Sequence, residues 1–124
     1  MMRKILPLLL MVMAFTFMAE QESQAQILST KLKITVIDPL GNVVEDAKVM
    51  LFANKADYLK ETNEVQPFKL TNAKGQVTFK KLDPKSYYIL VKKGDMSNSG
   101  GGEIVDTLEK GKLNKANVVI SDGL

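Results

Sequence analysis

The sequence contains no cysteine, no histidine and no tryptophan. Without cysteine the chain has no disulfide and no thiolate nucleophile. Without histidine it has neither a Ser-His-Asp triad nor the ligands of an ordinary zinc site. Its acidic residues are dispersed and do not stand at the alternating positions of a calcium loop. We therefore predict no catalytic residue, no metal site and no cofactor.

The chain also lacks a strong excess of charge of one sign. It has 17 lysines and arginines against 14 acids, a net charge of +3, and residues 1–25 hold two of each kind. The lysines are scattered along the remainder, whereas a nucleic-acid binder usually concentrates them on one face. We expect no nucleic-acid partner.

The sequence has one long apolar run, Ile5–Met18, which follows a short basic start. A membrane span needs about 20 apolar residues, and this run is shorter. Small residues, Ser23 and Ala25, stand at positions −3 and −1 before Gln26. These features predict a signal peptide over residues 1–25, cleaved between Ala25 and Gln26, with an uncleaved anchor as the alternative. The processed protein is then exported, either periplasmic or secreted, and does not span the membrane.

From Gln26 onward apolar and polar residues alternate, which is typical of half-buried strands. Turn sequences such as Asp38–Asn42 and Asn72–Gly75 separate the predicted strands. Residues 53–64 break the alternation and predict a long loop with one helical turn. Residues 26–124 are therefore predicted to form one all-β domain, a seven-stranded antiparallel Greek-key sandwich. Its predicted core consists of Ile34, Val36, Val49, Leu51, Val77, Phe79, Leu82, Tyr87, Ile89 and Val91.

Two stretches carry a resemblance to a known family. Val36-Ile37-Asp38 with Gly41–Val49, and Thr71–Phe79 with Leu82–Tyr87, resemble the opening and the centre of carboxypeptidase regulatory-like domains. The resemblance covers about residues 31–91. It implies a transthyretin-like, or prealbumin-like, sandwich that accompanies some peptidases without being one. The chain departs from the pattern at three turn positions, Val44, Asp46 and Ser86.

The layout is also similar to that of collagen-adhesin B-type repeats, which often close a Lys–Asn isopeptide bond. The position of the bonding lysine is Val36 here, and the strand near Val91 carries no assisting acid. The resemblance therefore implies a sandwich without this covalent bond.

One candidate partner surface comes from apolar residues at positions that should face away from the core. Strand outer faces are mostly polar, but four outward positions here are apolar: Met50, Phe52, Tyr88 and Leu90. Either residues 53–65 cover them, with Tyr58 and Leu59 as the lid, or they form a docking patch.

Two further features are candidates for contacts or modification. Ser97, Asn98 and Ser99 lie in a glycine-rich loop that is a candidate ligand-contact segment. Asp106-Thr107-Leu108 resembles an acceptor for bacterial O-glycosylation, with Thr107 as the acceptor residue.

The function predicted from these features is a secreted or periplasmic non-catalytic module that contacts a protein or the cell envelope. The alternative is a small carbohydrate-binding domain, for which Tyr58 and Tyr88 are the candidate stacking platforms.

Overall fold

The computed structural model of the chain describes residues 29–99 and 104–122. The predicted signal peptide and its cleavage site at Ala25 and Gln26 lie outside the described residues. Within the described part, no helix is both long and apolar enough to cross a membrane.

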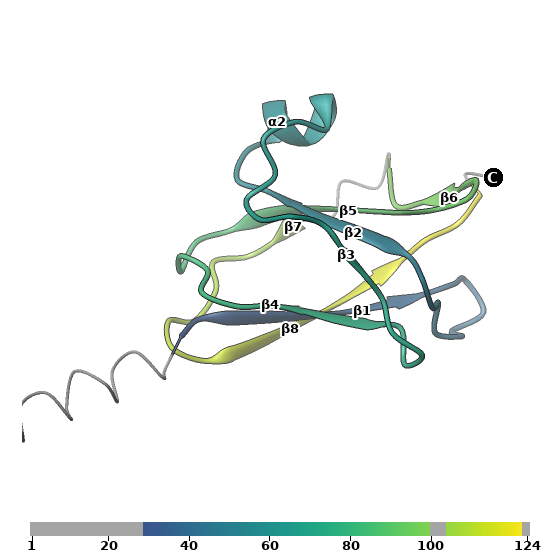
Figure 1. Cartoon of the computed structure of the whole chain (residues 1–124), viewed down its shortest axis with the longest axis horizontal. Coiled ribbons are helices and arrows are strands. Elements are labelled where there is room, and N and C mark those ends of the chain that lie inside the picture. Colours follow the sequence, from purple (N-terminus) through teal and green to yellow (C-terminus); the bar gives the residue numbers. More distant parts are fainter. Residues whose placement is uncertain (1–28, 100–103, 123–124) are drawn as a thin grey trace, which may run out of the picture.

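The described residues form two sheets packed face to face (Figure 1). Sheet A has the order β4-β1-β8, with β4 at Gln76–Phe79, β1 at Lys31–Ile37 and β8 at Leu113–Val119. Sheet B has the order β3-β2-β5-β6, and β7 also pairs with β5. Its strands are β3 at Lys69–Leu70, β2 at Lys48–Phe52, β5 at Tyr87–Lys93, β6 at Met96–Ser97 and β7 at Ile104–Val105. The all-β sandwich predicted from the alternation is confirmed.

The core lies between the two sheets and follows the period-two pattern of the sequence. In β1 the residues Leu32, Ile34 and Val36 are fully buried, while the residues between them are half-buried on the outer face. All ten predicted core residues are buried. The inward register of the strands was therefore predicted correctly, because one face of each sheet must be apolar.

The prediction that all strands are antiparallel is wrong, because β1 and β8 run parallel. The Lys31 N–H donates to the Lys112 carbonyl at 3.0 Å, so the chain enters both strands at the same end of the sandwich. The described part also contains eight strands where seven were predicted. The difference arises beside β5, where β6 and β7 occupy one edge as two separate two-residue pieces.

The expected helical turn is present as α2, Lys55–Lys60. Asn54 caps its first turn, since its side-chain oxygen accepts the Asp57 N–H at 2.9 Å. The helix ends at Glu61, whose φ of 54° is left-handed. It lies over the outer face of sheet B, above β2 and β5 (Figure 1).

The turn residues behind the family resemblance have clear structural roles. Gly75 has a φ of 72°, and a Cβ there would lie 2.9 Å from the Val36 carbonyl oxygen, so only glycine fits without movement. The Thr71 hydroxyl is buried, accepts the Ala47 N–H at 2.9 Å and donates to the Val44 carbonyl at 2.6 Å. Asp46 has a φ of 61° where the family often has glycine.

Candidate functional site

The predicted apolar patch on sheet B is not an exposed surface. Met50, Phe52 and Leu90 are buried, and Tyr58 of α2 packs over them with only 8% of its surface exposed. The Tyr58 ring meets Phe52 edge-on at a centroid distance of 6.1 Å and lies 5.4 Å from the half-buried Tyr88. Met50, Phe52, Tyr58 and Leu90 therefore form a second small core, with Tyr88 packed against it. Of the two alternatives, coverage by residues 53–65 agrees with the structure and an exposed docking patch does not.

The lid itself differs from the one expected. Tyr58 covers the cluster, whereas Leu59 is 66% exposed and points away from it. Adjacent side chains on an α-helix point about 100° apart, so Tyr58 can lie on the sheet while Leu59 faces solvent. Because Tyr58 is buried, it is also not available as an exposed stacking platform for a sugar.

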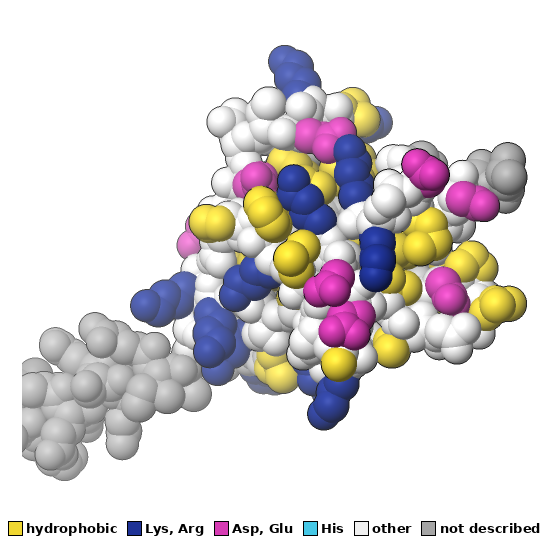
Figure 2. Space-filling view, turned by 45° about the vertical axis from the view of Figure 1, so that its right-hand side comes forward, with side chains coloured by type: hydrophobic (Ala, Val, Ile, Leu, Met, Phe, Trp, Pro, Cys, Tyr) yellow, Lys and Arg dark blue, Asp and Glu magenta, His cyan; other side chains and the backbone are white. Residues whose placement is uncertain are grey.

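The face of the molecule in Figure 2 shows where apolar side chains reach the surface. They occur there in small separate groups among lysines and acids, with no single continuous patch. Phe68, which is 47% exposed, carries the Lys48 ammonium 4.4 Å from its ring centroid. This exposed ring is thus partly screened by a cation.

The predicted ligand loop is largely structural. Asn98 is only 5% exposed, its Oδ1 accepts the Val91 N–H at 2.9 Å, and its Nδ2 donates to the Ile89 carbonyl at 2.7 Å. Between β6 and β7, the Asn98 side-chain amide thus bonds to the edge of β5 as the backbone of a neighbouring strand would. Its oxygen and its nitrogen both have a hydrogen-bond partner. Ser97 and Ser99 contact each other through their hydroxyls at 2.7 Å. Asn98 is therefore a clamp on β5, while the two serines keep partial exposure.

The predicted modification site keeps its acceptor at the surface. Thr107 is exposed, but the neighbouring Leu108 is buried and its N–H donates to the Lys85 carbonyl at 3.1 Å. O-glycosylation of Thr107 stays a prediction. Thr107 also lies on the wall of a groove described below.

The outer edge of β8 is the surface feature that sequence reasoning missed. Two backbone hydrogen bonds fix the phase of its pairing with β1: the Lys31 N–H donates to the Lys112 carbonyl, and the Ile120 N–H donates to the Ile37 carbonyl. In a parallel ladder every second residue of β8 then bonds to β1. The even-numbered residues 114–118 face β1, and the odd-numbered residues 113–119 turn their N–H and C=O groups outward. Within residues 29–99 and 104–122, no strand pairs with the outer edge of residues 113–119, whereas Ser121, two residues beyond β8, exchanges two backbone hydrogen bonds with Ser97 of β6 at 2.9 and 3.1 Å.

A groove of about 370 Å³ runs beside this edge, between β8 and the segment that begins with β7. Its surface is more polar than apolar. The apolar lining residues come from both sheets and are Ile89, Ile104, Val105, Leu108, Ala116 and Val118, and the polar ones are Asp106, Thr107, Asn114, Lys115 and Asn117. Ile104 is 53% exposed and Val105 and Ala116 are half-buried, so apolar surface is accessible in the groove. The edge and the groove together form what we call the β8 site.

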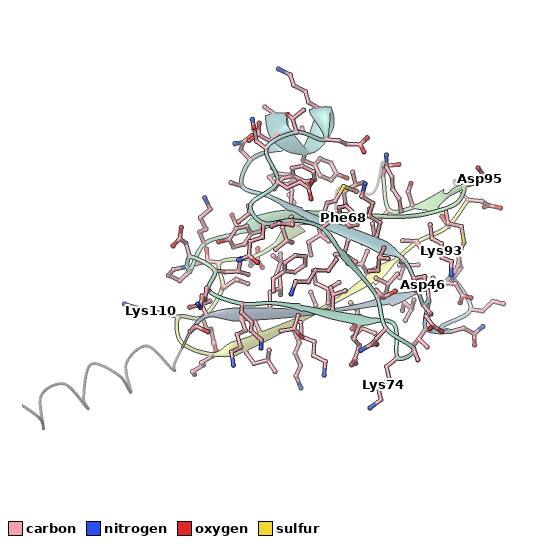
Figure 3. All side chains as sticks on the ribbon, in the orientation of Figure 1. Asp46, Phe68, Lys74, Lys93, Asp95 and Lys110 are labelled. Carbon is pink, nitrogen blue, oxygen red and sulfur yellow. The ribbon has the colours of Figure 1, made fainter. Side chains whose placement is uncertain are left out.

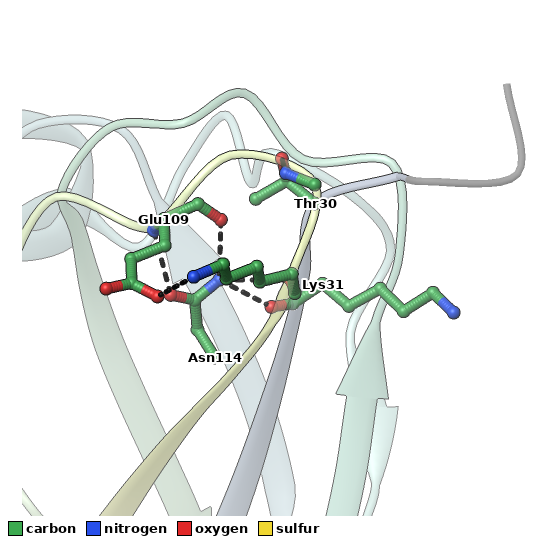
Figure 4. Close-up of polar contacts among 6 residues, drawn as sticks. Thr30, Lys31, Glu109 and Asn114 are labelled. Carbon is green, nitrogen blue, oxygen red and sulfur yellow. Dashed lines mark hydrogen bonds and ion pairs between the residues drawn. The ribbon is translucent and has the colours of Figure 1, made fainter. Parts of the chain in front are cut away.

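One end of the β8 site is held by the amide of Asn114 (Figure 4). Its Nδ2 lies within hydrogen-bond distance of the Lys31, Glu109 and Lys112 carbonyls, at 3.0, 3.2 and 3.2 Å. Its Oδ1 accepts the Glu109 N–H at 2.8 Å. These contacts fix the turn before β8, so the start of the open edge has a defined position.

The opposite edge of sheet A is covered, which makes the open edge of β8 distinctive. The outward carbonyls of β4 all accept bonds: Gln76 from the Asn72 N–H, Thr78 from the Lys69 ammonium, and Lys80 from the Gln66 amide. The distances are 3.1, 2.9 and 2.6 Å. Exposed edges are commonly blocked in this way because unpaired strands attract other chains. No such side-chain bond to β8 residues 113–119 occurs in the described part of the molecule on their outward side.

Sheet A also carries charge of one sign. Its strands contain three lysines, Lys31, Lys33 and Lys115, and no acid. Lys33 stands directly opposite Lys115 in the parallel register, and like charges so placed repel each other. In Figure 3 nitrogen-tipped side chains project from this sheet away from the sandwich. An anion beside β8 would relieve this repulsion.

The buried tyrosine of β5 serves the fold. The Tyr87 hydroxyl donates to the Asp83 carbonyl at 2.8 Å and ties the turn before β5 to the strand. Burial, together with the nearby Asp83 charge, raises the pKa of Tyr87 above its usual value. The phenol therefore stays a neutral donor at ordinary pH.

Comparisons with solved structures show that other proteins contain a similar sandwich. A streptococcal ancillary pilin matches with a TM-score of 0.57 and 15% identity over 75% of this chain. BcpA, the major pilin subunit of Bacillus cereus, matches with a TM-score of 0.53 and 13% identity over 77%. The Bacillus anthracis TIE protein matches with a TM-score of 0.53 and 20% identity over 75%.

These similarities establish the fold and no more, because identity is low. The alignments cover 32%, 30% and 16% of the three proteins, so this chain spans less than a third of each. A scan against protein-family models and a sequence search of curated proteins gave no match. Val36 and Val91, which stand where a collagen-adhesin repeat carries its bonding lysine and the strand of its acid, are both fully buried in the core.

Proposed function

We propose that this chain is an exported, non-catalytic module that docks another protein of the cell envelope at the β8 site. The observation that carries the proposal is the seven-residue edge of β8, which lies open beside a groove that contains both apolar and polar lining residues. An open edge offers main-chain hydrogen bonds, and the groove offers pockets for alternate side chains, which together are the two elements of strand addition.

Two other observations support this function. The similar solved structures include an ancillary pilin and a major pilin subunit, and a pilin subunit works by contacting other proteins. The turn residues Thr71 and Gly75 match the resemblance to carboxypeptidase regulatory-like domains, and Asp46 adopts a left-handed φ where those domains often have glycine. We assign the chain to a domain of that kind, with a transthyretin-like arrangement and a signal peptide over residues 1–25.

The test is site-specific photo-crosslinking in cells that produce the full chain. A photo-reactive amino acid replaces Val119, which faces outward at the end of the edge, and in a matched control it replaces Lys55 on α2. We expect a discrete protein adduct from position 119 and none from position 55. A second variant, Asn117→Pro, removes one outward N–H without touching a bond to β1, and it should abolish the adduct.

Two results of this experiment would contradict the proposal. One is equal crosslinking from positions 119 and 55, which would show that β8 has no special role. The other is an adduct from position 119 that persists in the Asn117→Pro variant while the protein keeps its wild-type unfolding midpoint. That result would mean that a partner is near β8 without pairing to it.

A further inference from the structure

Resting on the proposed function, we infer the chemistry of the partner: an extended segment of another protein in which apolar and acidic residues alternate. The apolar residues enter the groove beside β8, and the acidic residues lie over the lysines of sheet A. Three features of the β8 site, namely its backbone, its groove and its charge, each specify one part of this description.

The backbone specifies an extended segment. The odd-numbered residues of β8 present N–H and C=O groups outward at the spacing of a strand, and the other long edge of sheet A is capped by Lys69 and Gln66. A segment that adds to β8 satisfies these groups as a fourth strand of sheet A. A helix or a compact loop does not match this linear array.

The groove specifies small or medium apolar residues at every second position. Ala116 is the smallest inward residue of β8 and leaves the space that Ile104, Val105 and Leu108 border from the other side. Alternate side chains of an added strand point to the same face as Ala116, because side chains along a strand have a period of two. They enter the groove and bury its accessible apolar surface.

The charge specifies acids at the intervening positions. Those side chains point to the outer face of sheet A, beside Lys115 and within reach of the row that contains Lys33. The strands of that sheet contain no acid that balances these lysines. Asp106 and Lys115 both line the groove, and Glu109 is paired with Lys112 at 3.5 Å. Among the described residues Lys33 and Lys115 form no ion pair, so an acidic partner residue placed over them meets positive charge.

The same lysines argue against a second copy of this chain as the occupant. Pairing β8 with β8 would join two sheets into one surface and bring Lys115 and Lys33 of both copies together. Lysines on an edge strand are a common device against such self-pairing. A partner with acids removes the repulsion, whereas a second copy increases it.

The experiment uses the chain purified after export and two capped seven-residue peptides, one alternating Glu and Val and the other alternating Lys and Val. Affinity is measured by titration, and amide hydrogen exchange is followed by NMR in the same samples. The Glu–Val peptide should bind and slow exchange at the amides of Lys115 and Asn117. The amides of Ala116 and Val118 should change little, because they already bond to β1.

Charge reversal supplies the matched variants. Lys115→Glu should weaken binding of the Glu–Val peptide by about three- to tenfold, as expected for exposed ion pairs, and should favour the Lys–Val peptide. Lys55→Glu, an equal change on α2, should leave both affinities unchanged. Ala116→Leu should fill the groove and weaken both peptides, with the unfolding midpoint measured to confirm that the variant is folded.

Each contrary outcome overturns a stated part of the inference. Equal binding of the two peptides rules out charge recognition. Binding of the Glu–Val peptide without new protection at Lys115 and Asn117 rules out strand addition and leaves the lysines as a general anion surface. Protection that grows with protein concentration alone identifies a second copy as the occupant. If neither peptide binds while crosslinking from Val119 succeeds in cells, the partner chemistry is wrong and the docking function stands.

Discussion

At the scale of single residues, the buried Thr71 hydroxyl shows why a turn sequence resembles a family motif. It accepts the Ala47 N–H and donates to the Val44 carbonyl, so it provides a hydrogen-bond partner for two backbone groups in the loop between β1 and β2. The threonine of the resembling segment thus has a hydrogen-bonding reason to be there. Its hydroxyl has no access to water that could replace these bonds.

We expect Thr71→Val to lower the free energy of unfolding by about 1–3 kcal/mol, because it leaves a buried donor and a buried acceptor without a partner. Denaturant unfolding measures the loss. Thr35→Val on the outer face of sheet A is the control, and it should change stability by less than about 0.5 kcal/mol. Equal effects of the two changes would show that the Thr71 bonds do not stabilise the fold.

At the scale of elements, the alternation of the sequence predicts which side of each strand is buried, but not what covers the second side. Met50, Phe52 and Leu90 look like outward residues of a sandwich, and they are, yet α2 lies on top of them. A six-residue helix has too few turns to show an amphipathic period, so the sequence predicts a helical turn without its orientation. The choice between Tyr58 and Leu59 depends on that orientation.

The adjacent pair Tyr58 and Leu59 offers a matched test of this second core. Tyr58→Ser should destabilise the protein by about 2–4 kcal/mol, because it uncovers the rings and aliphatic chains beneath it. Leu59→Ser should change the unfolding midpoint little, since Leu59 is already exposed. A larger loss from Leu59→Ser than from Tyr58→Ser would contradict the observed packing.

The pairing of strands at the sheet edges is the second feature that the sequence does not predict. The final strand is visible in the alternation near residues 116–121, but its partners are not. That β8 joins β1 in parallel, and that its other side stays open, depends on contacts between residues about 80 positions apart. The short strand β6 likewise lies where the sequence indicates only a loop, next to Asn98, whose side chain bonds to β5.

At the scale of the whole molecule, the arrangement of the sheet edges distinguishes one side of the sandwich. The edge of β5 is completed by β6, the Asn98 side chain and β7, and the edge of β4 is capped by side chains. β3 is an edge of only two residues. In the described part of the chain, residues 113–119 of β8 are thus the long edge that remains available, and they border the groove and the lysine face.

The most direct test of this account is amide hydrogen exchange along β8 in the exported protein without any partner. We predict an alternating pattern, with slow exchange at Asn114, Ala116 and Val118 and fast exchange at Lys115 and Asn117. The even-numbered amides donate to β1, whereas the odd-numbered amides face water. Uniformly slow exchange from 114 to 118 would contradict the account, because it would show that the edge of β8 is already covered.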